Sequence, residues 1–437
     1  MKLKRLGSLG ILTFAAFAGG AVFGQSSLAT SRDESPYSVL EKLGRVLMLV
    51  ENAYVEPVDR DRVLEGAIKG MVAELDPHSS YMTKEEYEAF RSDTNGELSG
   101  IGIEVDMRDE GLTVLAPIEG SPAARAGLLP GDRIVAIDGQ PTRKFPVDEL
   151  VRRLRGLPGT RVVLSIRREG VEKTLTVPIV REKFHVTSVA GKWLEGGVAY
   201  VRIKQFQRGT HDELLRLLRD LRDGSSTLRG LVLDLRNNPG GLVEEAVGVT
   251  DEFLPAGGIY TTRHRGQVVD EVWARPGGAL IAPRVVVLVN EYTASAAELL
   301  AGALQDARRG TVVGSRTFGK GSVQTVLDLP GGAGVKLTTM RYYTPRGTSI
   351  QARGIEPDVV VEMSGDTDEA APTVREQDLR GHLPAEGGDE ARSTRVVRAA
   401  SPPKAGVLPP VAEIPSDPTQ GDDPVLALGY RLVRGLP

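Results

Sequence analysis

The stretch Val285-Val-Val-Leu-Val-Asn-Glu-Tyr-Thr-Ala-Ser-Ala-Ala-Glu-Leu-Leu-Ala-Gly-Ala-Leu-Gln305 joins an apolar run to a series of strong helix formers. The first five residues predict a strand buried on both faces, and residues 295–305 predict a helix. Ser295 is therefore expected at a strand-to-helix turn. Free N–H groups and the positive end of the dipole favour negative charge at a helix start. We expect the N–H of Ala296 to bind an oxyanion formed beside Ser295.

A serine is a weak nucleophile unless a neighbouring base takes its proton. Lys320, within Phe318-Gly-Lys-Gly-Ser-Val-Gln324, is the candidate base. A lysine can act in this way near neutral pH only when burial or a cationic neighbour lowers its pKa from about 10.4. We expect Gln324 to orient the amine through its amide oxygen, with a bend at Gly321. The hydroxyl of Thr317 is a further candidate contact.

The sequence resembles the C-terminal processing peptidases, the tail-specific serine proteases. The matching segments are Ser295-Ala-Ala-Glu298, Phe318-Gly-Lys-Gly321 with Gln324, Asp234-Leu-Arg-Asn-Asn-Pro-Gly-Gly241 and Gly354-Ile-Glu-Pro-Asp358. The resemblance implies a Ser295–Lys320 dyad supported by Gln324, with Gly241 and Ala296 as the oxyanion hole. It also implies a protein substrate that is cut near its C-terminus. The family commonly has Ser-Ala-Ser-Ala-Ser-Glu where this chain has Thr293-Ala-Ser-Ala-Ala-Glu298, and the nucleophile is retained.

Residues 97–182 resemble a PDZ domain over its whole length. The resemblance rests on Ser99-Gly-Ile-Gly-Ile103 and on Leu129-Pro-Gly-Asp132 about thirty positions later. Glycines let successive N–H groups face a terminal carboxylate, and the strand that follows would accept an extended peptide. We expect an apolar C-terminal residue to be preferred. The predicted peptide-binding residues are Gly100, Ile101, Gly102, Ile103, Leu150 and Leu154.

The N-terminus has the features of an export signal, with a basic start, an apolar segment over residues 9–23 and a cleavage site near residue 24. The apolar run is shorter than the roughly 20 residues of a spanning helix, which favours cleavage over retention as an inner-membrane anchor. We predict an exported protein of the periplasm or cell envelope. Residues 36–95 predict helices that either cap the core or, as the resemblance suggests, form a homo-oligomer. An accessory lipoprotein adaptor is a further candidate partner.

Strands and helices alternate over residues 183–365, which predicts an α/β layered core. The expected fold is thus α/β and multidomain, with a helical N-terminal region and a PDZ domain inserted before the serine protease core. Proline and acidic residues over 366–420 predict a disordered linker. Residues 422–437 predict a helix that either docks on the core or presents the chain's own end to the PDZ groove.

Composition excludes several classes of function. The chain of 437 residues has a formal net charge of −4. Loss of the export signal would remove three positive charges and make the protein more acidic. This balance argues against nucleic acid as a partner. The absence of cysteine excludes disulfides, a cysteine nucleophile and thiolate metal sites. No sequence motif for a metal or nucleotide is present, so we expect no metal and no cofactor.

Two alternatives remain open at this point. Asp234, His264 and Ser295 occur in an order that some catalytic triads have, although the flanking arginines of His264 suggest an exposed loop. The chain could also be a PDZ adaptor on an inactive peptidase scaffold, against which Ser295, Lys320 and Gln324 count. Asp306, about 16 Å along a straight helix from Ser295, is expected to be structural.

Overall fold

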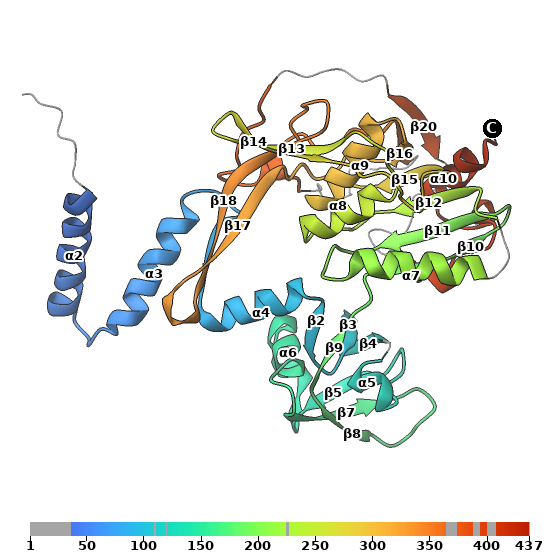
Figure 1. Ribbon diagram of the computed structural model, residues 1–437. Helices are drawn as coiled ribbons and strands as arrows, with labels where there is room; N and C mark the ends of the chain where they lie inside the picture. Colours follow the sequence, from blue (N-terminus) through green and yellow to red (C-terminus); the bar gives the residue numbers. More distant parts are fainter. Residues whose placement is uncertain are drawn as a thin grey trace, which may run out of the picture. The chain divides into compact units, whose positions relative to one another are not determined.

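A computed structural model describes residues 36–108, 111–118, 120–223, 227–363, 374–387, 394–399 and 408–436 (Figure 1). The predicted export signal at residues 1–24 lies outside these ranges, as do parts of the predicted linker. The internal contacts divide the chain into two units, residues 1–71 and residues 72–437. The first unit holds helix α2 (Pro36–Ala53) and most of helix α3 (Arg60–Ala73).

Helix α2 carries apolar side chains that are exposed within its own unit. More than half of the surface of Leu40, Val46, Met48 and Leu49 is accessible. Exposed apolar surface of this kind suits a helix that another surface is to cover. None of the described helices combines the length and the apolar character that crossing a membrane requires.

The predicted PDZ region forms a small domain around one sheet of order β3-β4-β5-β7-β8, with β6 paired to β5. Strands β2 and β9 pair antiparallel, which brings the entry and exit of the domain together. Helix α4 (Lys84–Thr94) precedes it and begins with the capping box between Thr83 and Glu86. The elements of the domain are β2 (Glu97–Gly100), β3 (Ile103–Arg108), β4 (Gly111–Pro117), α5 (Pro122–Arg125), β5 (Arg133–Ile137), β6 (Gln140–Pro141), η1 (Thr142–Lys144), α6 (Val147–Leu154), β7 (Arg161–Arg167), β8 (Leu175–Val180) and β9 (Glu182–His185).

The core is built on a seven-stranded sheet of order β10-β11-β12-β15-β16-β19-β20, parallel except for the β10–β11 pair. Alternate residues of the central strands face two apolar clusters. Leu231 and Leu233 pack with α7, α8 and α9, whereas Val232 and Leu288 pack with α10. Helices on both faces explain why strand β15 is apolar from Val285 to Val289. The elements are β10 (Val189–Leu194), β11 (Val198–Ile203), α7 (Thr210–Asp223), β12 (Gly230–Asp234), α8 (Val243–Asp251), β15 (Arg284–Val289), α9 (Ala296–Asp306), β16 (Gly310–Gly314), β19 (Val359–Met363), β20 (Arg395–Ala399) and α10 (Pro424–Arg434).

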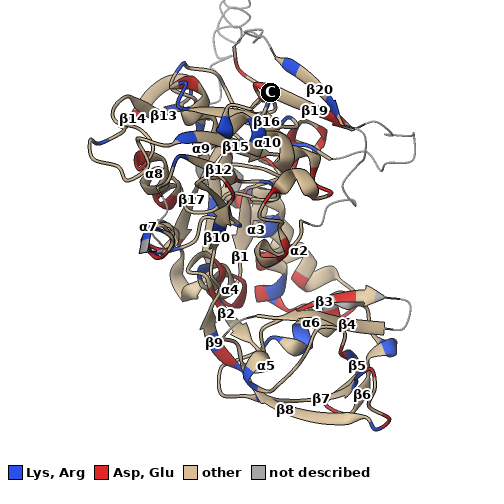
Figure 2. Cartoon of the chain, turned by 90° about the vertical axis from the view of Figure 1, so that its right-hand side faces the viewer, with Lys and Arg blue, Asp and Glu red and all other residues tan. Residues whose placement is uncertain are grey.

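A second sheet lies beside the core and carries the Lys320 segment into its strand β17. Its order is β1-β18-β13-β14, and β17 pairs antiparallel with β18. In the view of Figure 2, basic and acidic residues are mixed along the core and the small domain. The strands are β1 (Ser80–Met82), β13 (Gly258–His264), β14 (Gln267–Trp273), β17 (Ser322–Asp328) and β18 (Gly334–Tyr343), with η2 (Pro330–Gly332) between the last two.

The prediction of a disordered linker over 366–420 is wrong for the described parts of that range. Strand β20 extends the core sheet in parallel with β19. The short turn η3 (Glu376–Asp378) buries Glu376 completely, and η4 (Val411–Glu413) and η5 (Pro418–Gln420) lead into α10. Composition suggested disorder because few apolar residues are present, but tertiary partners supply the order here. The predicted C-terminal helix is confirmed, and it docks on the core sheet.

Candidate active site

Ser295 lies at the turn between β15 and α9, as predicted. Its backbone has φ 56° and ψ −120°, which non-glycine residues adopt only where the surrounding structure enforces it. The Thr293 hydroxyl donates to the carbonyl of Leu235 at 2.9 Å, and the N–H of Ala294 donates to the carbonyl of Asn238 at 2.9 Å. These bonds tie the nucleophile turn to the turn that follows β12.

The second turn, residues 237–241, packs directly against Ser295. A Cβ on Gly240 would lie 2.8 Å from the Ser295 Cβ and 2.9 Å from the Ala296 nitrogen, so only glycine allows this approach. A Cβ on Gly241 would lie 2.0 Å from the carbonyl oxygen of Phe206. Among the residues that the structure describes, neither Gly241 nor Ala296 donates a backbone hydrogen bond. These two N–H groups are thus available to a ligand next to the nucleophile turn.

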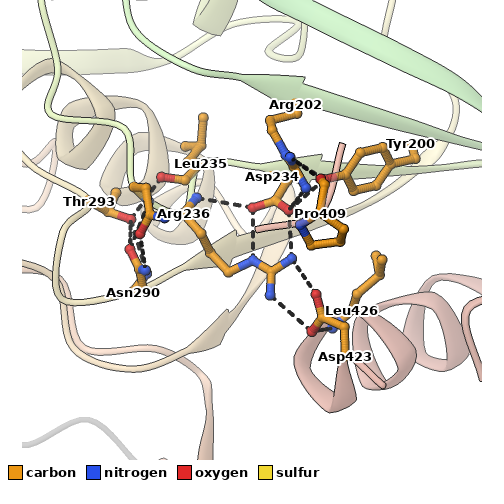
Figure 3. A network of polar contacts seen from close by, with 11 residues as sticks. Tyr200, Arg202, Asp234, Leu235, Arg236, Asn290, Thr293, Pro409, Asp423 and Leu426 are labelled. Carbon is orange, nitrogen blue, oxygen red and sulfur yellow. Dashed lines mark hydrogen bonds and ion pairs between the residues drawn. The ribbon is translucent and has the colours of Figure 1, made fainter. Parts of the chain in front are cut away.

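A buried ion-pair network holds the start of this turn (Figure 3). Arg236 lies 2.7 Å from the carboxylate of Asp234 and 2.8 Å from that of Asp423. Burial raises the pKa of Asp234, but the charges of Arg236 and Arg202 outweigh it and leave that pKa below its ordinary value. Asp423 caps the start of α10. The C-terminal helix is therefore connected through the Arg236–Asp423 ion pair to the start of the turn beside Ser295.

The alternative triad of Asp234, His264 and Ser295 is wrong. The carboxylate of Asp234 accepts hydrogen bonds from the guanidinium of Arg236 and from the hydroxyl of Tyr200, each at 2.7 Å. His264 is exposed at the end of β13 in the other sheet, where its Nδ1 lies 2.8 Å from the carbonyl of Thr339. Asp234 consequently does not orient His264.

Glu298, in the first turn of α9, connects the serine to the lysine. Its carboxylate is completely buried, and the single oxygen Oε2 accepts the N–H of Ser295 at 2.7 Å and that of Lys320 at 2.9 Å. Oε1 accepts the N–H of Gly319 and the hydroxyl of Thr317. Burial raises the pKa of Glu298 to about 7, against these four hydrogen bonds, which lower it. One carboxylate thus anchors the backbone of both candidate catalytic residues.

Every backbone N–H of the Lys320 loop, residues 317–321, has an acceptor. These acceptors are the carbonyls of Ile355 and Thr293, the two oxygens of Glu298, and the side-chain oxygen of Gln351. The last of these reaches the N–H of Gly321 at 3.0 Å. A loop held at five successive positions presents its lysine from a fixed backbone, so movement of the amine is left to side-chain rotation.

The amine of Lys320 is in surroundings that favour its neutral form. Burial, followed by the positive charge of Lys336, lowers the pKa of Lys320 below its ordinary value, while the carboxylates of Glu376, Glu298 and Asp76 act in the opposite direction. Within the described residues, no hydrogen bond joins this amine to the Ser295 hydroxyl. Catalytic hydrogen bonds are often formed only when substrate is bound.

Gln324 lies two residues into β17, and its amide nitrogen donates to the hydroxyls of Ser322 and Thr338 at 2.9 and 3.3 Å. No hydrogen bond links it to Lys320 in the part of the chain that is described, so its supporting role stays a prediction. Asp306 accepts the backbone N–H of Arg346 at 3.0 Å, which agrees with the structural role expected for it.

The small domain has a groove of about 110 Å³ at the predicted peptide site. The prediction for Leu150 is wrong, because this side chain is 1% exposed and does not line the groove. Val151, one position along the helix, faces the groove instead, and Phe184 of β9 was missed because it lies far away in sequence. The predicted residues that do line the groove are Gly100, Ile101, Gly102, Ile103 and Leu154.

Three family models match parts of the chain. Residues 197–361 match the model of peptidase family S41, residues 113–168 match a PDZ domain, and residues 17–86 match the N-terminal domain of the activating protease CtpB. A carboxy-terminal-processing protease of Bartonella bacilliformis is 40% identical over 414 residues, which are 94% of this chain and 91% of that protein. A probable CtpA-like serine protease of Staphylococcus aureus is 38% identical over 76% of this chain and 66% of its own length.

Among solved structures, the photosystem II D1 C-terminal processing protease is 33% identical, with a TM-score of 0.47 over 73% of this chain and 86% of that one. The peptide-bound PDZ domain of a Vibrio cholerae carboxy-terminal protease is 31% identical, with a TM-score of 0.20 over 21% of this chain and 99% of that one. The sequence relationship to the Bartonella protein extends over nearly the whole of both chains. The chain therefore belongs to peptidase family S41 and is a PDZ-containing serine peptidase of the carboxy-terminal-processing kind.

Proposed function

We propose that this peptidase captures proteins by their C-terminal tails and cuts them near that end through a Ser295–Lys320 dyad. The observation that carries the proposal is the double contact of Glu298, whose Oε2 accepts the N–H groups of both Ser295 and Lys320. Residues 25 positions apart in sequence are thereby held around one buried atom. The lowered pKa of the Lys320 amine supports its role as a base.

The proposed reaction proceeds in two halves. The Ser295 hydroxyl attacks the scissile carbonyl as the neutral Lys320 amine takes its proton, and the resulting ammonium then protonates the leaving amine. The N–H groups of Gly241 and Ala296 hold the oxyanion. Water, deprotonated by the same lysine, hydrolyses the acyl-enzyme and regenerates Ser295. Gln324 would act on the lysine once the amine turns toward the serine.

The groove of the PDZ domain is the proposed site of tail capture. An extended peptide would pair with the edge of β3, and its last side chain would lie against Val151 and Leu154. Gly102 permits the tight turn before this strand, because a Cβ there would lie 2.3 Å from the Ser121 Cβ. The apolar lining favours an apolar final residue.

Val151→Glu is expected to raise KM for an apolar-tailed protein by about 10- to 100-fold, because a carboxylate would be buried against the tail. The kcat for a short peptide that does not need the groove should be unchanged. Val180→Glu is the matched control, because Val180 is 49% exposed on β8 of the same domain. An unaltered KM in the Val151→Glu variant would show that the groove does not take part in substrate capture.

We also propose that the chain is exported to the periplasm or cell envelope and self-associates through α2 and α3. The exposed apolar side chains of α2 support self-association. The basic and apolar composition of residues 1–24 supports export. Delivery of substrates by an accessory lipoprotein stays a prediction.

The enzyme is distinguished from an inactive adaptor by one paired assay. Full-length protein and its Ser295→Ala variant are incubated with a reporter protein that ends in an apolar tail, and cleavage and binding are both measured. We expect the wild type to shorten the reporter and the variant to bind it without cutting. Binding without cleavage by both proteins would establish an adaptor and refute the proposed chemistry.

A further inference from the structure

The segment 374–383, beyond the match to the peptidase family, forms part of the wall around the Lys320 loop. The backbone N–H of Glu376 donates to the carbonyl of Phe318 at 3.2 Å, two residues before the lysine. The Glu376 side chain has no exposed surface, although neighbouring Asp378 is exposed. A carboxylate is buried only where specific partners repay its loss of hydration.

The first partner of Glu376 leads to the Lys320 loop. Its Oε1 accepts the side-chain N–H of Gln351 at 2.8 Å, and the oxygen of the same carboxamide accepts the N–H of Gly321 at 3.0 Å. Gln351 is fully buried, and a Cβ on Gly321 would lie 2.3 Å from its backbone nitrogen. The carbonyl of Leu383 accepts the same carboxamide nitrogen at 3.0 Å, so Glu376 and Leu383 together turn the oxygen of Gln351 toward the N–H of Gly321.

The second partner is His78, whose Nε2 lies 2.7 Å from Oε2 of Glu376. His78 belongs to a turn in which Asp76 accepts the backbone N–H groups of His78 and Ser79 at 2.9 and 3.0 Å. The hydroxyl of Thr338 donates a hydrogen bond to the carboxylate of Asp76 and accepts one from the amide nitrogen of Gln324. The turn before β1 is thus linked to Gly321 through Glu376 and Gln351, and to Gln324 through Thr338.

The charges around the amine come from four different elements. Glu376 from η3, Glu298 from α9 and Asp76 from the turn before β1 favour the charged lysine, and Lys336 from β18 opposes it. Glu376 is therefore both a geometric anchor of the loop and one of the charges that act on its amine.

We propose that Glu376 is a positioning residue of the active site, which holds the Lys320 loop through Gln351 and through the carbonyl of Phe318. This inference rests on the proposed role of Lys320 as the base. It extends the active site to a segment that the family match does not include.

The test compares Glu376→Gln, Glu376→Ala and Lys320→Ala in the full-length protein, with kcat and kcat/KM measured across pH. The glutamine can still accept from Gln351 and contact His78, but it carries no charge. We expect the acid limb in the pH profile of kcat/KM for Glu376→Gln to move to lower pH by about half a unit or more. Removal of a neighbouring negative charge makes the lysine easier to deprotonate. The alanine variant should lose about 10- to 100-fold in kcat, because the carboxamide of Gln351 keeps only the carbonyl of Leu383 as an acceptor and can shift away from Gly321.

Asp378→Asn is the control, because it removes a carboxylate from the same turn where solvent screens it. Its pH profile should coincide with that of the wild type. Glu298 titrates in all of these proteins, so only differences between profiles are interpreted. An inactive Lys320→Ala, with wild-type kcat in Glu376→Ala and an unshifted profile in Glu376→Gln, would overturn the role of Glu376 alone. Full activity in Lys320→Ala would overturn the proposed base and this inference with it.

Discussion

Lys320→Ala is expected to lower the rate of peptide-bond cleavage by at least about 10³-fold, because Ser295 would lose the group that takes its proton. The fold should persist, since the backbone of the loop is held by Glu298 and Gln351 and not by the amine. Tail binding should be unchanged, because the groove is in the small domain. Single-turnover cleavage, thermal unfolding and tail binding measured on the same protein separate these effects.

His264→Ala is the matched control for this loss. His264 is exposed and bonded to the carbonyl of Thr339, so its removal should leave cleavage within about twofold of the wild type. Cleavage that survives Lys320→Ala and is lost in His264→Ala would transfer the role of base to the histidine.

Glu298→Ala is expected to lower kcat by at least about 100-fold, because Ser295 and Lys320 lose their common anchor and small displacements of reacting groups are costly. Four donors would be left in a buried site, so the free energy of unfolding should fall by about 2–4 kcal/mol. Glu298→Gln should also be impaired, because each carboxylate oxygen accepts two donors and an amide nitrogen accepts none. Cleavage kinetics and chemical denaturation measure the two losses.

Glu291→Gln controls for the removal of a negative charge from the same turn. Its carboxylate accepts the hydroxyl of Ser315 and contacts neither Ser295 nor the Lys320 loop through a hydrogen bond in the described structure. Activity within about threefold of the wild type is expected. A Glu298→Ala variant with normal kcat would mean that the shared anchor is not needed for the geometry of the site.

The positions of Ser295 and of the turn 237–241 were predictable, because both depend on local patterns. An apolar run followed by helix formers marks a strand-to-helix turn, and a glycine pair after a buried strand marks a close approach. Parallel strands place the two turns at the same edge of the sheet. Neighbouring strands β12 and β15 then bring them into contact.

The partners of the lysine were not predictable by the same means. Glu298 has the ordinary signature of a glutamate at the third position of a helix, and only the fold brings it to Lys320. Glu376 lies within a stretch whose composition is typical of disorder. The sequence did contain a hint of the role of Glu298. A glutamate among the apolar and small residues of a buried helix needs several hydrogen-bond donors around it.

The residues that line the peptide groove could be predicted only in part from the sequence. Helical spacing places Leu150 and Leu154 on one face, but Val151 and Leu154 are equally close neighbours on a helix. Which pair enters the core depends on how the helix is rotated against the sheet. Leu150 packs in the core, and Val151 lines the groove.

The central claim is that the amine of Lys320 is neutral when Ser295 reacts. It is tested most directly by measuring the pH dependence of acetylation of Lys320 in the Ser295→Ala protein, by mass spectrometry, with exposed Lys204 as the reference for the reagent. We predict a midpoint below the ordinary lysine pKa of about 10.4, and we expect it to coincide with an acid limb in the kcat/KM of the wild type. A midpoint at or above that value, in a protein whose wild type cuts substrate at neutral pH, would contradict the account.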